Sequence, residues 1–372
     1  MIARTARWLN QNFRFRILRL FLYKERKFYQ LLILLFIVAG IAYPYPKIAM
    51  WVGFLFAGYS AIANDSIQTI GTFLASNARR PWWVLWIFVA GIFVATMVYS
   101  WVQYNGDVSY ERLASKGFSE APQSFQFLQL AAPLVLLFLT RLKMPVSTTF
   151  LCLSVYSSNL DGIQGMLLKS VSGYGVAFAT AIVIWFLLAK PIRRLTVGEP
   201  SPIWVVIQWM ISGSLWAVWL MQDGANIAVS LPRSLTALEL VFFLSYIVLG
   251  LGLLFYLRGD KIQEIVTEKS QVQDVRAASI VDLVYAIILF VFKEISNVPM
   301  STTWVFLGLM AGRELAMTLQ KVYDTRRKMS TTWYIIRKDV INAAIGLIVS
   351  VAIAILVNPK IMEEIGAYFV SK

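Results

Sequence analysis

A run of hydroxyl side chains behind a proline occurs twice in this 372-residue chain. Pro145–Thr149 has the sequence Pro-Val-Ser-Thr-Thr, and Pro299–Thr303 has the sequence Pro-Met-Ser-Thr-Thr. At roughly 5 % per residue type, four fixed letters recur by chance on the order of once in 10⁵ positions, so two copies indicate internal duplication. A proline that opens a helix leaves first-turn N–H groups without intrahelical partners, and such a donor-rich end binds anions. The candidate ligands for an oxyanion are therefore Ser147, Thr148, Thr149, Ser301, Thr302 and Thr303.

Serine and threonine also have a structural role in membrane helices, because they bond back to carbonyls one turn earlier or hold helices together. For a single Ser-Thr-Thr run, that structural role is the favoured interpretation. Because the run occurs twice, each time after a proline, anion binding becomes the favoured interpretation. Two such helix ends that face each other would surround one tetrahedral oxyanion with donors.

An asparagine precedes each hydroxyl run at a similar distance. Ile62–Asp65 (Ile-Ala-Asn-Asp) lies upstream of the first run, and Gly224–Ile227 (Gly-Ala-Asn-Ile) lies upstream of the second. The separation from asparagine to proline is 145 − 64 = 81 residues in the first half and 299 − 226 = 73 residues in the second. The order is kept and the spacing nearly so, which predicts two repeats, at 28–195 and 196–358.

Asp65 is a candidate cation ligand. A carboxylate near the bilayer centre costs several kcal/mol unless a proton, a cation or a basic partner neutralises it. Asn64 and Gln68 lie beside it and one turn on, and they would supply the carbonyl oxygens that hard cations such as sodium accept. The alternative is a salt bridge to an arginine or lysine of another span. That alternative is stronger for charged residues nearer to the predicted loops, which are Asp282, Glu294 and the pair Arg313-Glu314.

The composition predicts an all-α polytopic membrane protein. Hydrophobic residues make up 58 % of the chain and charged residues 15 %, and the apolar runs are solid rather than alternating, which excludes a membrane barrel. The net charge of 34 − 20 = +14 reports loop charge and orientation, and it does not indicate a nucleic-acid partner. The chain has no histidine and one cysteine, Cys152, so an imidazole metal site and an intrachain disulfide are both excluded.

The apolar runs predict about 11–12 transmembrane segments. The run at 48–76 is too long for one straight crossing and has the polar pair Asn64-Asp65 in its middle, so we expect an interrupted helix there. Re-entrant hairpins would change the count of helices without changing their order. The predicted spans are 28–43, 48–76, 82–104, 126–142, 144–160, 173–189, 202–222, 237–257, 276–295, 299–319 and 338–357.

Basic residues predict the orientation of the chain. Residues 1–27 carry eight Lys and Arg against one acid, with apolar residues every four positions, which is typical of an amphipathic helix on the cytoplasmic leaflet. If the N-terminus is cytoplasmic, the later Arg- and Lys-rich loops also fall inside, as the positive-inside rule requires. The Asn64 and Asn226 spans then run in opposite directions, so the two repeats are predicted to be inverted, as in many transporters. Residues 359–372 form a C-terminal tail.

The same motifs resemble those of the inorganic phosphate transporter (PiT) family. The stretch Ile62–Thr72 is similar to that family's Gly-Ala-Asn-Asp-Val-x-Asn-x-x-Gly-Thr signature, and both hydroxyl runs are similar to its Pro-x-Ser-Thr-Thr-His. The resemblance covers both halves of the chain in the family's order. It implies an inverted-repeat symporter, dimeric in the membrane, that carries inorganic phosphate with sodium or protons. It also implies that the Asn-Asp and Ser-Thr-Thr positions line the shared substrate and cation site, while some relatives carry sulfate.

The chain departs from the family pattern, mostly in its second half. Phe150 and Trp304 stand where the family has histidine, and Ile227 follows Asn226 where the family has aspartate. Asp223 lies one turn before Asn226 and is a candidate replacement for the missing carboxylate. Arg233 follows seven residues after Asn226, which is close to two helical turns, so a helix would place both on one face. We expect Arg233 to face the anion together with Asn226; the alternative is that Arg233 snorkels to the interface.

Together these patterns favour a secondary active transporter of inorganic phosphate, coupled to sodium or protons and located in an inner or plasma membrane. Sulfate is the alternative cargo, and a non-transporting receptor or channel is the alternative class. We expect no enzymatic activity, since the sequence shows no nucleophile or acidic metal cluster for work on phosphorylated lipids. No cofactor is expected beyond the coupling ion, with sodium at Asp65 as one form of it.

Overall fold

The computed structural model describes residues 25–114, 118, 120–142, 144, 146–157, 160–257, 274–295, 301–321, 329–358 and 362–363. These residues form helices and connecting loops, and no strand occurs among them. The basic segment at 1–24, both prolines of the hydroxyl runs and most of the tail at 359–372 lie outside the described residues. The helices are α2 (Arg26–Ala42), α3 (Pro46–Ser60), η1 (Ala61–Asp65), α4 (Ser66–Ser76), α5 (Trp82–Gln103), α6 (Phe127–Arg141), α7 (Thr148–Ser154), α8 (Leu160–Leu195), α9 (Ile203–Ala228), α10 (Ala237–Tyr256), α12 (Val275–Ile295), α13 (Thr302–Leu319) and α14 (Met329–Val357).

The protein is an all-α polytopic membrane protein, as its composition predicts. Among the described helices, six stretches are long and apolar enough to cross a bilayer, and these are Pro46–Asp65, Trp82–Gln103, Ile163–Ile192, Ile203–Ala228, Ala237–Tyr256 and Met329–Val357. In the part of the chain that the structure describes, six of the 11–12 expected segments thus form long apolar helices. Several of the other apolar runs form shorter helices. The length of an apolar run does not show where in the bundle its helix begins.

The predicted span at 144–160 is wrong as a crossing. Its helix, α7, has only seven residues, which is about 10 Å of rise. The matching run at 299–319 forms α13, with 18 residues. Both helices are capped in the same way, since the Ser147 and Ser301 hydroxyl oxygens accept hydrogen bonds from the backbone N–H groups of Phe150 and Trp304.

The interruption predicted at 48–76 is confirmed. Helix α3 begins with Pro46 in its first turn, where a missing N–H costs nothing. It passes into the π-helical turn η1 at Ala61–Asp65 and continues as α4. The hydroxyls of Ser66 and Thr69 donate to the carbonyls of Ile62 and Asp65 at 2.5 and 2.8 Å, so they bond the widened turn internally. This turn is what aims Asn64 and Asp65 into the bundle.

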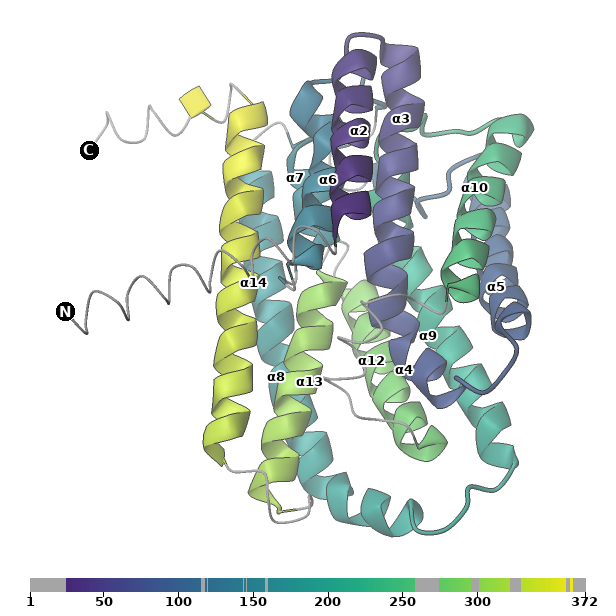
Figure 1. Ribbon diagram of the computed structural model, residues 1–372, viewed down its shortest axis with the longest axis vertical. Coiled ribbons are helices and arrows are strands. Elements are labelled where there is room, and N and C mark those ends of the chain that lie inside the picture. The colour runs from purple at the N-terminus through teal and green to yellow at the C-terminus, as the bar shows by residue number, and fades with distance from the viewer. Residues whose placement is uncertain are drawn as a thin grey trace, which may run out of the picture.

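The helix that carries Asn64 and the helix that carries Asn226 run in opposite directions. The Asn77 amide donates to the Gln208 side chain beyond one end of α4, and the Ser230 hydroxyl donates to the Met50 carbonyl near the start of α3. As residue numbers rise along α3 and α4, the neighbouring residue numbers on α9 fall, so the two helices are antiparallel. Figure 1 shows the same opposition, with α3 and α4 descending while α9 rises.

The two hydroxyl-bearing helices also point in opposite directions, and α14 shows this. The Thr332 hydroxyl, near the start of α14, lies 2.9 Å from that of Thr318 at the far end of α13. Asn358, just after α14, donates to the Ser157 carbonyl beyond the end of α7. Helix α14 has 29 residues, or about 43 Å, so it separates these two ends by nearly the height of the bundle (Figure 1). The first turns of α7 and α13 must therefore lie between them.

Helix α13 packs directly against the backbone of α8. A Cβ atom at Gly312 would lie 2.8 Å from the Ala181 Cβ and closer still to the Phe178 carbonyl oxygen. At Gly308 it would lie 3.2 Å from the Phe178 nitrogen and closer to the Tyr174 carbonyl oxygen. These two glycines, four residues apart, allow the close helix contact that is typical of small residues in membranes.

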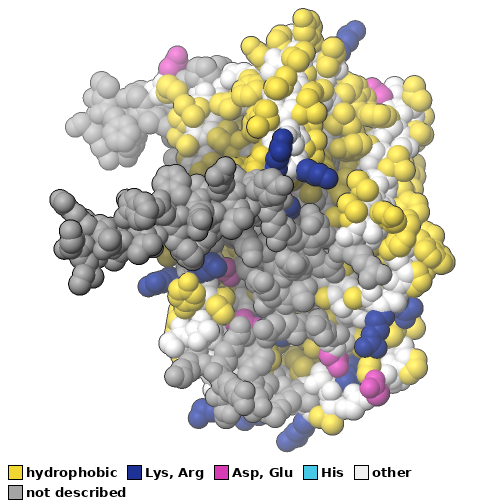
Figure 2. All heavy atoms as spheres, in the orientation of Figure 1, with side chains coloured by type: hydrophobic (Ala, Val, Ile, Leu, Met, Phe, Trp, Pro, Cys, Tyr) yellow, Lys and Arg dark blue, Asp and Glu magenta, His cyan; other side chains and the backbone are white. Residues whose placement is uncertain are grey.

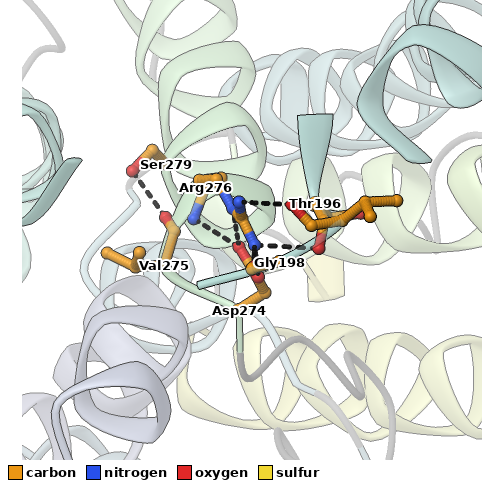
Figure 3. Close-up of polar contacts among 7 residues, drawn as sticks. Thr196, Gly198, Asp274, Val275, Arg276 and Ser279 are labelled. Carbon is orange, nitrogen blue, oxygen red and sulfur yellow. Dashed lines mark hydrogen bonds and ion pairs between the residues drawn. The ribbon is translucent and has the colours of Figure 1, made fainter. Parts of the chain in front are cut away.

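The connection from α8 to α9 is fastened to the start of α12 by Arg276, which is 4 % exposed. Its guanidinium donates at 2.8 Å to the carbonyls of Thr196 and Gly198, and it pairs with Asp274 at 2.7 Å (Figure 3). Burial alone would raise the pKa of Asp274, but the hydrogen bonds and charge of Arg276 outweigh burial, and this pKa lies below its ordinary value. The ordered connection positions both α9 and α12.

The outer surface is apolar, as a lipid-facing surface should be. Hydrophobic side chains dominate the described surface in the upper part and along the right edge of Figure 2, with lysines and arginines scattered between them. Exposed aliphatic residues include Ile33 and Ile37 on α2 and Leu249 and Leu253 on α10. The polar residues of interest lie inside, where the described chain buries them.

The glycine contact predicts a stability difference. Gly312→Ala should lower the thermal unfolding midpoint in detergent, because the methyl group overlaps backbone atoms of α8 at a cost of about 1–3 kcal/mol. Gly175→Ala is the matched control, since nothing lies within 4 Å of a Cβ there. The single cysteine, Cys152, is buried, so its reaction with a fluorogenic maleimide reports unfolding. Equal midpoints for the two variants would contradict the packing argument.

Candidate functional site

Asp65 lies at the centre of the bundle and accepts hydrogen bonds from two polar neighbours. The Thr148 hydroxyl on the first turn of α7 donates to its Oδ1 at 2.7 Å, and the Asn64 amide donates to the same oxygen at 2.6 Å. The Gln68 amide donates in turn to Asn64 Oδ1 at 3.0 Å. The predicted group of Asn64, Asp65 and Gln68 is therefore assembled on one side of η1 and α4. Asp65 is only 3 % exposed.

Asp223 joins the two hydroxyl runs. The Thr149 hydroxyl donates to its Oδ1 at 3.1 Å, and the Thr302 hydroxyl donates to its Oδ2 at 2.7 Å. Asn226, one turn further along α9, donates to Asp223 Oδ1 at 2.9 Å and to the Thr149 hydroxyl oxygen at 3.0 Å. A single carboxylate thus connects the first turn of α7 with the first turn of α13.

The two carboxylates belong to one site. Thr148 and Thr149 are neighbours in the chain, and the first bonds Asp65 while the second bonds Asp223. Asn64, Asn226, Ser147, Ser301 and Thr303 are all buried in the same region, with 3 % or less of each residue exposed. The structure therefore brings Thr148, Thr149 and Thr302 into contact with the two carboxylates, while Ser147 and Ser301 cap the same two helices. Thr303 is buried on the same first turn as Thr302, Gln68 lies at a half-buried edge, and Arg233 lies elsewhere.

Two acceptor atoms in this site have capacity for a further ligand. Asp65 Oδ2 and Asn226 Oδ1 are buried and accept no hydrogen bond from the described part of the chain. An orphaned buried acceptor costs free energy, roughly 1–3 kcal/mol for a neutral group and more for a charged one. A proton on Asp65, or a sodium ion between oxygen ligands, would remove that cost. No group of three or more acidic or thiol ligands for a metal occurs among the described residues.

Arg233 does not belong to this site. Helix α9 ends at Ala228, so Arg233 does not share a helical face with Asn226, and that prediction is wrong. The Arg233 guanidinium donates to backbone carbonyls, at 2.7 Å to Phe118 and 3.0 Å to Glu120. It also donates to the carbonyls of its own loop, so it fastens two loops together. Pro232, which cannot continue a helix, was the sequence signal for this end.

A third buried carboxylate, Asp282, has hydroxyl partners in place of the salt bridge that its position in the sequence favours. Asp282 on α12 bonds to hydroxyls, with the Thr72 hydroxyl donating to Oδ1 and the Ser212 hydroxyl donating to Oδ2 at 2.5 Å. Its partners in the described chain are therefore not basic residues. Thr72 lies two turns after Asp65 on the same face, a spacing that could have pointed to this cluster. Arg313 and Glu314 do pair with each other, at 3.1 Å, and the Glu294 side chain lies outside the described residues.

A pocket of about 490 Å³ lies beside the Asp65 side of the site, between α2, α3, α6 and α10. Most of its lining is apolar, and Thr140 and Arg141 are polar residues in it. The Thr140 hydroxyl donates to Asn64 Oδ1 at 3.3 Å. The pocket therefore reaches the hydrogen-bonded group around Asp65, and Thr140 is a contact that the sequence motifs did not reveal.

The hydroxyl contacts of Asp282 predict a stability effect. Thr72→Val removes the donor but keeps the shape of the side chain, so it should destabilise the protein by about 1–3 kcal/mol, the cost of an acceptor left without its donor. Thr72→Ser keeps the hydroxyl and is the control. Scanning fluorimetry of the tryptophan emission would compare the two unfolding midpoints. The hydroxyl contact has no structural importance if Thr72→Val unfolds at the same temperature as Thr72→Ser.

Comparison with known proteins gives no relative from which a role for these residues could be transferred. The resemblance to the PiT family remains a prediction from three sequence motifs, and the geometry of the site has to support any function by itself. The chain matches no protein-family model, no curated protein and no solved structure.

Proposed function

We propose that this protein is a secondary active transporter that carries inorganic phosphate across a membrane together with sodium ions or protons. The observation that carries the proposal is the meeting of two hydroxyl-bearing first turns at buried carboxylates in the middle of the bundle. Thr148, Thr149 and Thr302 direct their hydroxyls at Asp65 and Asp223. Buried acids inside a membrane mark ion pathways and proton relays.

The hydrogen bonds supply a mechanism for coupling. While the carboxylates are charged, they hold the threonine protons and would repel an anion. Once a proton or a sodium ion neutralises Asp65 or Asp223, the hydroxyls are free to donate to an oxyanion instead. Cation binding therefore prepares the anion site, and the anion favours the cation-loaded state by the same coupling free energy.

The arrangement of helices supports access from two sides. The helices that carry the two hydroxyl runs leave the centre in opposite directions, toward the two ends of α14. A site at the midplane between oppositely directed elements is the arrangement that alternating access requires. The interrupted helix at η1 adds a polar, non-α-helical turn that lines the site, which is also typical of transporters.

Two other functions use some of the same features. Sulfate is a tetrahedral oxyanion that six hydroxyls could also bind, so it is the alternative cargo. A receptor or channel would use the site without coupled movement of the carboxylates. The rest of the proposal comes from the sequence: a homodimer in an inner or plasma membrane, a cytoplasmic N-terminus, and no enzymatic activity.

Uptake into proteoliposomes tests the transport proposal. Radiolabelled phosphate should accumulate in vesicles that contain the wild-type protein when a sodium or proton gradient is imposed, and sulfate should compete weakly. Asp65→Asn should abolish gradient-driven accumulation, because an amide cannot bind the coupling proton or balance a sodium ion. Surface expression and the unfolding midpoint of this variant serve as its controls. If Asp65→Asn accumulates as much phosphate as the wild type does, Asp65 has no role in coupling.

A paired substitution tests whether the two halves share one anion site. Thr148→Val and Thr302→Val each remove one hydroxyl from opposite helices, so each should weaken phosphate binding by about 0.5–1.5 kcal/mol, or roughly 2- to 13-fold. Binding to purified protein in nanodiscs would give both values by calorimetry. Thr318→Val, on α13 but at its far end, is the control. A large loss for one variant with no change for the other would contradict a shared site.

A further inference from the structure

The loop between α5 and α6 folds inward against α9. The Val108 carbonyl oxygen would lie 3.2 Å from a Cβ at Gly224, the residue next to Asp223. Leu113 and Ser109 are each 1 % exposed. The Tyr110 hydroxyl donates to the Thr96 carbonyl of α5 at 2.7 Å. The loop therefore covers the last turns of α9 and the neighbourhood of the central site.

A second loop, between α9 and α10, holds the first in place. The Leu235 N–H donates to the Gly106 carbonyl at 2.9 Å, and the Ser234 hydroxyl donates to the Asn105 carbonyl at 2.8 Å. Gly106 has φ +96, and a Cβ there would lie 3.1 Å from the Leu235 nitrogen, so the contact needs glycine. Arg233 adds its bonds to Phe118 and Glu120. We call residues 105–114 the lid, and the second loop is its clamp.

The lid carries a buried arginine. Arg112 is 7 % exposed, although arginine is rarely buried without charge compensation. Burial lowers the pKa of its guanidinium, and the carboxylate of Asp223 acts in the opposite direction and raises it. Arg112 is thus buried in a loop whose backbone lies against Gly224, the residue next to Asp223, and the carboxylate that joins the two hydroxyl runs is the charge that offsets part of its burial.

We propose that Arg112 is the residue through which the lid binds the oxyanion at the central site. A guanidinium carries a permanent charge and a planar fork of donors that matches two oxygens of a phosphate or sulfate. The sequence favours such a charge at Arg233, whose donors instead hold Phe118 and Glu120, which follow the lid in the same loop. This inference rests on the proposed function, since it assigns a further ligand to the same anion site.

The electrostatic attraction between Arg112 and Asp223 would allow one arginine to serve both states. Without an anion, the guanidinium balances the charge of Asp223 inside the bundle. When a cation or proton occupies the carboxylates, that balance is no longer needed, and the guanidinium takes up the anion as its counter-charge. The first half has Asn64 and Gln68 beside Asp65, and the lid gives the second half a cationic group in their place.

The experiment measures inorganic phosphate and sulfate binding to purified protein in nanodiscs by calorimetry. Arg112→Gln should weaken binding of the anion at least 10-fold, and Arg112→Lys should recover part of that loss, because lysine restores the charge but not the fork. Arg233→Gln is the matched control on the clamp, and it should change the affinity less than Arg112→Gln does. If Arg112→Gln does not fold, the double variant Arg112→Gln with Asp223→Asn is compared with Asp223→Asn alone, so that the difference in affinity between these two reports Arg112; equal affinities would overturn the proposal.

The outcomes separate the two proposals. If the wild type binds neither phosphate nor sulfate, the proposed function fails and the role of Arg112 fails with it. If the wild type binds and Arg112→Gln binds equally tightly, the role of Arg112 alone is overturned. A loss in Arg112→Gln that Arg112→Lys does not reduce, or that Arg233→Gln reproduces in full, would assign Arg112 only to holding the lid and would also overturn the proposal.

Discussion

The hydrogen bonds to Asp223 are the interaction on which the rest of the centre depends. A carboxylate in the interior of a membrane protein is stable only if donors or a counter-charge replace its water. Here Thr149 supplies a donor from α7, Thr302 supplies one from α13, and Asn226 supplies one from α9 itself. Three helices that are distant in sequence must therefore meet at one point. Helices α7 and α13 both begin at this carboxylate, and from it they run in opposite directions.

The first half solves the same problem with a different local structure. At Asp65 the helix widens into the π-helical turn η1, whereas α9 continues as α-helix through Asp223 to Ala228. The widened turn presents Asn64 and Asp65 side by side. The Gln68 amide, one turn further along, donates to the Asn64 side chain and fixes its orientation. The two halves thus reach similar carboxylate–threonine contacts from unlike backbones. The sequence difference matches this structural difference, since a regular helix presents residues 223 and 226, one turn apart, on the same face.

Most of the central group could be predicted from sequence because its signal is local. Four fixed letters repeated behind a proline, and polar residues inside an apolar run, mark positions that hydrocarbon does not tolerate without a reason. The interruption of the long span followed from the same polar pair. Arg233 was placed wrongly because the helix was extended past Ala228, although Pro232 indicated an end. The short α7 was missed because an apolar run has the same composition whether it crosses the bilayer or starts at its centre.

Arg112 and Asp282 could not have been found in that way, since their burial depends on contacts between distant segments. Arg112 lies in a polar loop with mixed charge. That loop folds inward only because Val108 packs on Gly224 and because Arg233, on the clamp, bonds to the loop at Phe118. Asp282 meets Thr72 and Ser212 from two other helices. The buried charges of this protein are thus compensated by groups that other segments bring to them. The ionic state of the centre would then depend on the position of the lid and of the helices around it, which is the property that the proposed coupled transporter needs.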